Sequence, residues 1–442
     1  MATPRHSIRL SPRPPASREE DVSSGHLFRP RAPRSVRETG LGLGFLADLV
    51  LKIMYFEGVI TGVDLSDRIK LPFTGVLEEV LEFLKREKLC EVKGAEGFGG
   101  ATYQYAITMK GSERAREVLE RSQYAGPAPV TLEAYTEAIR RQPLGRMVVH
   151  QRAMRQALSH LVISEETFSQ IGPAVNSGRS IFLFGHPGNG KTAIAESIGR
   201  MLMQGDMYIP YAVEVDGQII KVFDSVNHRR LEEEVPKGMD PRWVHIRRPV
   251  ITVGGELTME SLDLVYNETN KYYEAPFQMK ANGGMFLIDD FGRQQVRPRD
   301  LLNRWIVPLE KRVDYLTLHT GRKIEVPFDV LIVFSTNLAP KDLVDEAFLR
   351  RIRHKIEIKD PTFEQYREIF KRVCQDRGVP YDDAGLRYLL KTYYVDARRP
   401  LRACHPRDLV DQLIDIARYL NVEPRLSKEL IDRAAQAYFV EL

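Results

Sequence analysis

The fold is decided by residues 185–192, which read Gly185-His186-Pro187-Gly188-Asn189-Gly190-Lys191-Thr192. This octapeptide fits the phosphate-loop pattern, in which two glycines separated by four residues are followed by Lys and Thr. Residues 180–184, directly before it, form a short apolar run that predicts a buried strand, and residues 193–203, directly after it, have helical spacing. A strand, a glycine-rich turn and a helix N-terminus in this order predict an anion site.

The residue types in the octapeptide suit the phosphates of a nucleotide. Gly185, Gly188 and Gly190 let the backbone bend so that its N–H groups face a phosphate. Lys191 can reach the outer phosphates, and the Thr192 hydroxyl can ligate Mg²⁺. We therefore expect the whole octapeptide to hold a nucleoside triphosphate, with Lys191 also taking part in catalysis.

A second motif supplies carboxylates. Residues 285–288 are an apolar run that ends in Asp289 and Asp290. Asp289 would hold the Mg²⁺ ion through its hydration shell, and Asp290 would orient and polarise an attacking water. Many buried strands end in acidic residues, so this motif gains its weight from the phosphate loop that precedes it.

A third apolar run, residues 330–334, is followed by Ser335, Thr336 and Asn337. With the two earlier motifs, it makes residues 145–442 resemble the AAA+ ATPase family. The resemblance implies ATP and Mg²⁺ as ligands and an α/β P-loop core with a parallel sheet. It also implies that Asn337 is sensor 1, which hydrogen-bonds the γ-phosphate or the attacking water.

The resemblance extends to arginines in the last part of the chain. In the family, an arginine finger on one subunit reaches the γ-phosphate held by its neighbour, and Arg351 best matches that position, ahead of Arg350 and Arg353. Arg407, at the start of a predicted helix, resembles sensor 2, which touches the nucleotide from the same subunit. A finger that acts between subunits implies a homo-oligomer, which we expect to be a hexameric ring.

Two hairpins are predicted in this region. Residues 315–326 alternate around Thr320-Gly321, and a hairpin at this place is typical of the AAA+ branch that includes MoxR-like and magnesium-chelatase-like proteins. The other turns at Asp216-Gly217. Such insertions either line a pore and grip a partner or are passive elaborations.

The sequence departs from the family at the carboxylate motif. Family members usually have Asp-Glu, whereas this chain has Asp289-Asp290. Because Asp is one methylene shorter than Glu, either the backbone shifts to compensate, or hydrolysis is slow, or the chain binds ATP mainly as an assembly switch.

The pattern of composition and periodicity divides the chain into five segments. We expect a disordered Arg- and Pro-rich tail (1–40), a winged-helix-like α+β domain (41–122), a linker leading into a helix (123–145), the α/β core (146–360) and a helical lid (361–442). The winged-helix interpretation rests on three helices followed by a hairpin of residues 90–92 and 103–107.

Charge argues against a DNA-binding role for the winged-helix-like domain. Residues 41–122 carry 11 basic and 13 acidic side chains, so a phosphate backbone would be repelled, and a protein-contact role is favoured. Residues 1–40 carry eight arginines against four acidic residues, which accounts for the whole net charge of +4.

The remaining composition bounds the class of protein. No apolar run approaches the roughly 18 residues of a membrane span, and no signal-peptide pattern is found near the start. The three cysteines are far apart and have no metal-ligand spacing, so reduced thiols in a cytoplasmic protein are expected.

These observations lead to one functional hypothesis with two alternatives. The chain is expected to bind and hydrolyse ATP with Mg²⁺, assemble into a ring and remodel or regulate a macromolecular partner. The first alternative is a slow-hydrolysing assembly switch. The second is a DNA-associated regulator or loader that acts through the winged-helix-like domain, with nucleic acid possible but not favoured as a partner.

Overall fold

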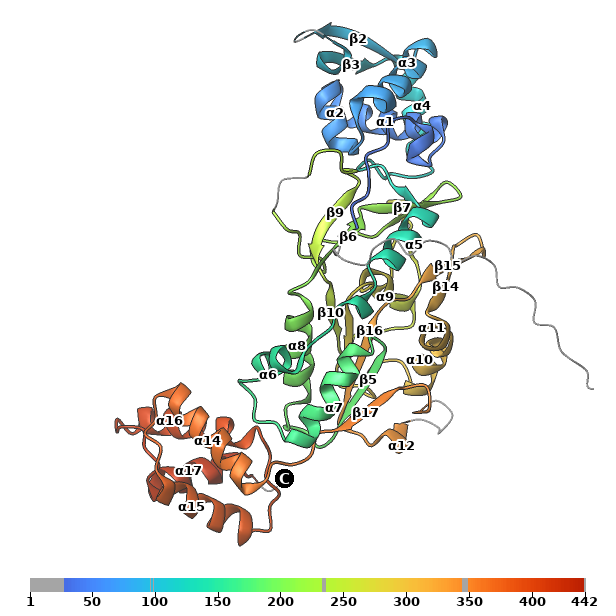
Figure 1. Ribbon diagram of the computed structural model, residues 1–442. Helices are drawn as coiled ribbons and strands as arrows, with labels where there is room; N and C mark the ends of the chain where they lie inside the picture. Colours follow the sequence, from blue (N-terminus) through green and yellow to red (C-terminus); the bar gives the residue numbers. More distant parts are fainter. Residues whose placement is uncertain (1–27, 96, 98, 233–235, 344–348, 441–442) are drawn as a thin grey trace, which may run out of the picture.

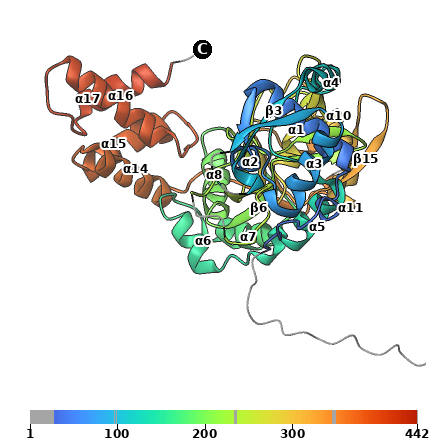
Figure 2. The same cartoon turned by 90° about the horizontal axis from the view of Figure 1, so that it is seen from above.

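The computed structural model describes residues 28–95, 97, 99–232, 236–343 and 349–440. The described part is elongated (Figure 1), with a small α+β domain at one end, an α/β core in the middle and a helical C-terminal domain at the other end. Seen from above, the helical domain extends to one side of the core, while the N-terminal domain lies over the core (Figure 2).

A five-stranded parallel sheet forms the core, in the order β10-β13-β16-β5-β17. Its strands are β5 (Ser180–Phe184), β10 (Val250–Val253), β13 (Met285–Ile288), β16 (Leu331–Thr336) and β17 (His354–Glu357). All residues of β13 and β16 are buried, as expected for a parallel sheet that is covered on both faces. The predicted α/β fold is confirmed.

Alternate residues of the strands pack on opposite faces of this sheet. Ile181 and Leu183 belong to the hydrophobic core on the face covered by α6 (Gln151–Ala157), α7 (Glu165–Asn176) and α8 (Lys191–Leu202). Phe182 packs on the other face with Phe286 and Trp305, next to α10 (Pro298–Arg304) and α11 (Ile306–Lys311). The period-two pattern of β5 therefore lets this strand contribute to the hydrophobic cores on both faces of the sheet.

A second β region lies between the core and the N-terminal domain. It contains β4 (Val130–Thr131), β6 (Asp206–Pro210), β7 (Ala212–Val215), β8 (Gln218–Lys221), β9 (Trp243–Arg247), β11 (Val265–Asn267) and β12 (Tyr272–Glu274). The predicted hairpin at Asp216-Gly217 is confirmed, because β7 and β8 pair antiparallel and both turn residues have positive φ. The hairpin of β14 (Val313–Thr317) and β15 (Lys323–Pro327) is also confirmed.

Three further helices complete these regions: α5 (Leu132–Arg141), α9 (Phe277–Lys280) and α12 (Pro340–Leu343). Helix α5 is the helix expected after the predicted linker, and it begins at the N-cap Thr131, whose hydroxyl accepts from the backbone N–H of Ala134. Tyr135 on α5 is fully buried against the second β region, so α5 is fixed to the core.

The N-terminal domain contains α1 (Leu43–Glu57), β1 (Val59–Thr61), α2 (Gly62–Ile69), α3 (Glu78–Arg86), β2 (Cys90–Ala95), β3 (Tyr103–Ile107) and α4 (Met109–Leu119). The three strands form an antiparallel sheet in the order β1-β3-β2, which confirms the predicted hairpin. Helix α3 begins only at Glu78, because Thr74 and Gly75 before it have non-helical backbone angles. Whether the domain is a winged helix stays a prediction.

The prediction of a disordered tail is wrong for residues 28–40, whereas residues 1–27 lie outside the described residues. The segment from Phe28 to Glu38, which we call the arm, is extended over most of its length and packs between the N-terminal domain and the second β region. Val36 and Thr39 are buried, and Arg31 forms an isolated antiparallel bridge with Met239. Val36 is buried in the hydrophobic core of the N-terminal domain, and this burial stabilises the ordered segment. The Pro- and Arg-rich composition of the segment gave no indication of such an anchor.

Four helices form the C-terminal domain: α14 (Phe363–Arg377), α15 (Asp383–Leu390), α16 (His405–Tyr419) and α17 (Lys428–Tyr438). They enclose a hydrophobic core of their own, and α14 begins with a capping box between Thr362 and Gln365. The prediction that the C-terminal region is helical is confirmed. Among the described residues, no helix is both long and apolar enough to cross a membrane.

Candidate functional site

Three neighbouring strands of the core end side by side at one edge of the sheet. Strand β16 lies between β5 and β13, and its register pairs Thr336 with Phe184 and Phe334 with Ile288. The octapeptide follows β5, the paired aspartates follow β13, and Asn337 follows β16. Parallel pairing therefore brings together three motifs that are far apart in the sequence, at the edge where open α/β sheets place their ligands.

The glycines of the octapeptide adopt backbone conformations that other residues rarely adopt. Gly185, Gly188 and Gly190 all have positive φ, at 142°, 80° and 85°. A Cβ atom on Gly185 would lie 2.3 Å from the carbonyl oxygen of Ile358, and one on Gly188 would lie 2.4 Å from Sγ of Cys404. The loop therefore needs glycine at 185 and 188 both for its curvature and for close approach of its neighbours.

The Lys191 side chain lies within the loop. It is buried, and its Nζ donates hydrogen bonds to the carbonyl oxygens of Gly185 at 3.0 Å and His186 at 2.9 Å. Burial lowers the pKa of Lys191, while the carboxylates of Asp290 and Asp289 act to raise it. The ammonium group is thus positioned at the N-terminus of α8, where an anion would find both its charge and the helix dipole.

Thr192 and Asp289 form a pair of oxygen donors. Oγ1 of Thr192 donates to the Asp289 carboxylate, with distances of 3.1 and 3.0 Å to its two oxygens. A hydroxyl and a carboxylate are hard oxygen ligands of the kind that Mg²⁺ takes. The two residues therefore fit the metal-binding role that the sequence predicts for them.

Asp290 has an unusual backbone conformation, with φ of 47°. Positive φ is uncommon outside glycine, although Asp tolerates it better than most residues. The Asp290 carboxylate accepts a hydrogen bond from Nδ2 of Asn337 at 3.4 Å, so the predicted base and the predicted sensor are in contact. The turn after Asp290 is held to β16, because the N–H of Phe291 donates to the carbonyl of Ser335 at 2.7 Å.

Gln294 holds the same turn from its other side. Its Nε2 donates to the carbonyl oxygens of Asp289 at 2.9 Å and Asp290 at 3.2 Å, and its Oε1 accepts from the N–H of Gly292 at 2.8 Å. Sequence reasoning missed Gln294, since a glutamine in a loop carries no local signal for such a role.

The helical domain contacts the octapeptide directly. The N–H of Cys404 donates to the carbonyl of Gly188 at 2.8 Å, and the N–H of Ala403 donates to Oδ1 of Asn189 at 3.3 Å. Nδ2 of Asn189 donates to Asp360 at 2.6 Å, and Arg402 forms an ion pair with the same carboxylate. The sequence did not indicate these contacts, which depend on how the two domains pack.

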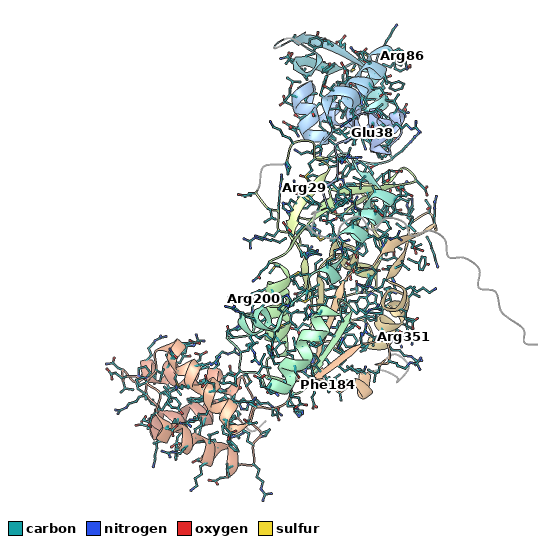
Figure 3. All side chains as sticks on the ribbon, viewed as in Figure 1. Arg29, Glu38, Arg86, Phe184, Arg200 and Arg351 are labelled. Carbon is teal, nitrogen blue, oxygen red and sulfur yellow. The ribbon has the colours of Figure 1, made fainter. Side chains whose placement is uncertain are left out.

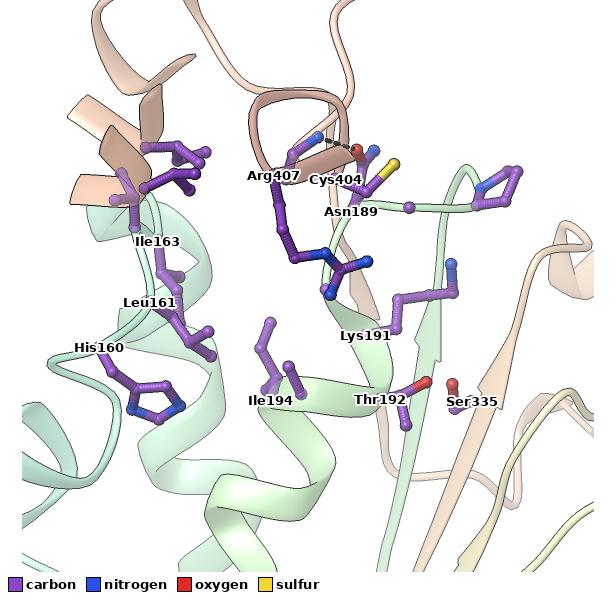
Figure 4. Close-up of a pocket in the computed structure, with 18 of the residues that line it drawn as sticks. His160, Leu161, Ile163, Asn189, Lys191, Thr192, Ile194, Ser335, Cys404 and Arg407 are labelled. Carbon is purple, nitrogen blue, oxygen red and sulfur yellow. Dashed lines mark hydrogen bonds between the residues drawn. The ribbon is translucent and has the colours of Figure 1, made fainter. Parts of the chain in front are cut away.

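A cavity of about 560 Å³ lies between the core and the helical domain. Nine of the predicted site residues line it: Pro187, Gly188, Asn189, Gly190, Lys191, Thr192, Asp290, Asn337 and Arg407. Figure 4 shows His160, Leu161 and Ile163 facing Lys191 and Thr192 across the cavity, with Ile194 between them. Gly185, His186 and Asp289 do not line the cavity, although they contact residues that do.

Arg407 enters the cavity from the helical domain. It lies in the first turn of α16, just after Pro406, and Figure 4 shows its side chain extending toward Ile194 and the octapeptide. Its side chain remains 62% exposed, and its Nε donates to Asp408 at 3.2 Å. This geometry gives Arg407 access to a ligand bound by the loop of the same chain.

Arg351 does not line the cavity. Its Nε donates to Glu310 of α11 at 2.6 Å, and Figure 3 places it on the side of the core away from the helical domain. Arg350 and Arg353 are exposed near it, whereas residues 345–348 of the predicted helix before the finger lie outside the described residues. Arg351 therefore could not contribute to the cavity of its own chain in this arrangement.

The fold and the site define a class of protein. It is α/β, with a five-stranded parallel sheet, a glycine-rich loop that encloses a buried lysine, two carboxylates after strand β13, and a helical C-terminal region docked on the loop.

Comparison with known proteins adds three findings. The helical domain matches, over residues 362–437, a family described as "Domain of unknown function (DUF8689)", and no curated protein matches the chain by sequence. NtrX from Brucella abortus in complex with ATP is a similar solved structure, with 14% identity and a TM-score of 0.40 over 64% of this chain and 58% of that chain. The Thermotoga maritima RuvB Holliday junction branch migration motor is similar with 14% identity and a TM-score of 0.36, over 63% of this chain and 71% of that chain.

Proposed function

We propose that this chain is a Mg²⁺-dependent ATPase of the AAA+ type that assembles into a ring and acts on a macromolecular partner. The observation that carries the proposal is the convergence of Lys191, Thr192, Asp290, Asn337 and Arg407 on one cavity. These residues come from the octapeptide, two further strand ends and the helical domain. Their combination of cations, hydroxyl, carboxylate and amide suits a triphosphate and the water that attacks it.

The two sides of the cavity suit the two ends of ATP. The loop side offers backbone N–H groups, the Lys191 ammonium and the N-terminus of α8 for the phosphates. The opposite side offers Leu161, Ile163 and Val373 as an apolar wall for the purine base. Thr192 and Asp289 would hold Mg²⁺, which when bound neutralises charge on the β- and γ-phosphates.

Hydrolysis needs a positioned water. Asp290 orients and polarises this water, and Asn337, in hydrogen-bond contact with Asp290, senses the γ-phosphate. Asp290 stands where the family usually has the longer Glu. Its positive φ and the hydrogen bonds of its turn support the possibility that the backbone shifts to compensate for the missing methylene.

Assembly would complete the site. In the single chain Arg351 pairs with Glu310. In the ring, Arg351 would leave Glu310 and contact the γ-phosphate of the ATP that the neighbouring subunit binds. A closed ring follows if every subunit offers Arg351 to the next one.

The experiment is a measurement of phosphate release from ATP, with and without Mg²⁺, over a range of protein concentrations. We expect Mg²⁺-dependent turnover per chain that rises as the chain assembles. Arg351→Ala should abolish the rise and leave ATP binding intact, whereas Arg350→Ala and Arg353→Ala serve as matched controls. Turnover that is unchanged in assembled Arg351→Ala would show that the finger is another residue, and absence of ATP binding to the native chain would refute the proposal.

The turnover rate of Asp290→Glu distinguishes a slow assembly switch from an ATPase that hydrolyses ATP efficiently. If Asp290 limits the rate, the longer carboxylate should raise turnover by roughly tenfold or more. If the backbone already compensates, as the geometry favours, Glu should lower turnover because it overreaches the water position. A pull-down with Asp290→Asn in ATP should then retain the partner and identify it.

A further inference from the structure

A second cavity, of about 1230 Å³, lies at the junction of the N-terminal domain and the second β region. The arm forms one side of it, and the turn at Pro72–Gly75, the C-terminal end of α5 and residues 236–239 form the others. Figure 3 labels Arg29 and Glu38, which lie near this junction and far from the ATP-type site. We call this cavity the basic groove.

The arm is fixed in place by backbone contacts. The N–H of Ala32 donates to the carbonyl of Gly238 at 3.0 Å, and the N–H of Asp240 donates to the carbonyl of Pro30 at 2.9 Å. The carbonyl of Arg34 approaches Gly75 so closely that a Cβ there would lie 2.3 Å from its oxygen. The arm is therefore a preformed wall, and its side chains need little further ordering to meet a ligand.

Among the residues that the structure describes, five cationic side chains and one carboxylate line the groove: Arg29, Arg31, Arg34, Arg141, Lys237 and Glu38. All five cations belong to exposed residues, and no ion pair is found for any of them within the part of the chain that the structure describes. The Glu38 carboxylate accepts a hydrogen bond from the backbone N–H of Arg34 at 2.8 Å, so it is already engaged. Arg141 lies over the ring of Phe28, with its Cζ 5.1 Å from the ring centroid.

Such a concentration of uncompensated charge has a physical cost. Like charges repel one another, whereas Arg242 and Arg304, for example, each pair with a carboxylate, Asp240 and Asp314 respectively. Three of the five groove cations belong to residues 1–40, the segment that carries the whole net charge of +4. A bound polyanion would remove the repulsion and release its own counterions.

The chemistry of the groove favours a phosphodiester chain among polyanions. Four of the five cations are arginines, whose planar guanidinium groups fork onto phosphate oxygens. The groove follows an extended segment and is too large for one phosphate, so its ligand should repeat its charge along a chain, as nucleic acid does at every nucleotide. A lipid surface would call for exposed apolar side chains beside the cations, whereas Val36 of the arm is buried and Phe28 is half-buried.

We propose that the basic groove binds the backbone of a nucleic acid without reading its sequence. This contact is independent of the ATP site, and it places nucleic acid on the arm and α5 instead of on the acidic helix α3 of the N-terminal domain.

The test is fluorescence anisotropy of the full chain with labelled single-stranded and duplex DNA of roughly 20 nucleotides, at several salt concentrations. The triple variant Arg29→Ala, Arg31→Ala, Arg34→Ala should bind roughly 10- to 100-fold more weakly at low salt. The slope of log affinity against log salt should fall by about 2 for single strands and about 3 for duplex. The double variant Arg141→Ala, Lys237→Ala changes the opposite wall without touching the arm and should lower the slope by about 1.5.

The matched control is Arg116→Ala, Arg121→Ala, Arg299→Ala, which removes the same charge from exposed arginines outside the groove. This control should bind as the native chain does. Equal losses in the control and in the groove variants would overturn the proposal, as would binding that depends only on residues 1–27. Displacement of the DNA by polyglutamate at equal charge would assign the groove to an acidic protein instead.

Discussion

The cavity at the octapeptide and the basic groove both contain several cationic side chains, but only in the first are these cations paired with carboxylates. In the site, Lys191 faces Asp289 and Asp290, Arg402 pairs with Asp360, and Arg407 is hydrogen-bonded to Asp408. In the groove, five cations face one carboxylate that already accepts a backbone hydrogen bond. The difference shows two ways to hold an anion: internal pairing pre-organises a site for one small ligand, whereas unpaired charge awaits a ligand that carries many charges.

The largest effect is expected at the centre of the balanced site. Lys191→Ala removes the buried cation and leaves the carbonyls of Gly185 and His186 without their donor. We expect ATP turnover to fall on the order of 10³-fold, because that charge is buried next to the phosphates and would stabilise the charge that develops on them. Phosphate release measures the effect, and Lys323→Ala, an exposed lysine on β15, should leave turnover as it is.

Salt should separate the two regions. Raising salt from about 50 to about 200 mM should weaken nucleic-acid binding by the groove on the order of 10²-fold, since five phosphate contacts release their counterions. ATP binding should change by no more than roughly threefold, because partly buried charges are screened less. Parallel titrations measure both, and an equal salt response would remove the distinction between the regions.

A tenfold effect is expected at Gln294. Gln294→Ala frees the turn after Asp290, and we expect kcat for ATP to fall roughly tenfold while KM changes little, because the hydrogen bonds of Gln294 go to this turn and not to the octapeptide that binds the phosphates. Gln295→Ala is the matched control, since Gln295 is exposed and has no hydrogen bond to the turn. A fall in kcat for Gln295→Ala, or a rise in KM for Gln294→Ala, would contradict a positioning role.

The smallest expected effect is that of pH on the thermal stability of the helical domain. Burial lowers the pKa of His405 to about 4, and the positive charge of Arg402 acts in the same direction. Between the unfolded pKa of 6.5 and about 4 the unfolded chain binds more protons, so the stability of the helical domain is complete above pH 6.5 and falls as the pH is lowered. The Tm should fall by about 2–4 °C more in the native chain than in His405→Gln between neutral and acidic pH. His150→Gln, which changes an exposed histidine, should follow the native chain.

The sequence predicted the parts of the site whose signals are local. The octapeptide lies between an apolar strand and a helix, and Asp289 and Asn337 each follow an apolar strand, so their places at one edge of a parallel sheet could be expected. The helical character of the C-terminal region was likewise evident from its sequence pattern. Local patterns suffice for these elements because each one buries its own apolar face.

The sequence could not show what depends on packing between distant segments. Gln294 acts through a turn whose shape follows from Asp290, and Asn189 accepts a hydrogen bond from Ala403 only when the helical domain meets the core. The arm was mistaken for disordered chain because its prolines and arginines conceal the few residues that anchor it: Val36 in the N-terminal core, the buried Pro33, and Phe28, which packs against Trp243. Composition averages over a segment, whereas a few buried side chains can decide whether the segment orders.

The close approach of Gly188 to Cys404 means that substitutions at these two positions are coupled. Any side chain at position 188 would collide with Sγ of Cys404, and the backbone of the two residues is joined by a hydrogen bond. Through evolution, the octapeptide and the loop before α16 would therefore have to change in concert, since a larger residue on either side would part them. Among relatives of this chain, a bulkier residue at 404 should be absent wherever the two segments remain in contact.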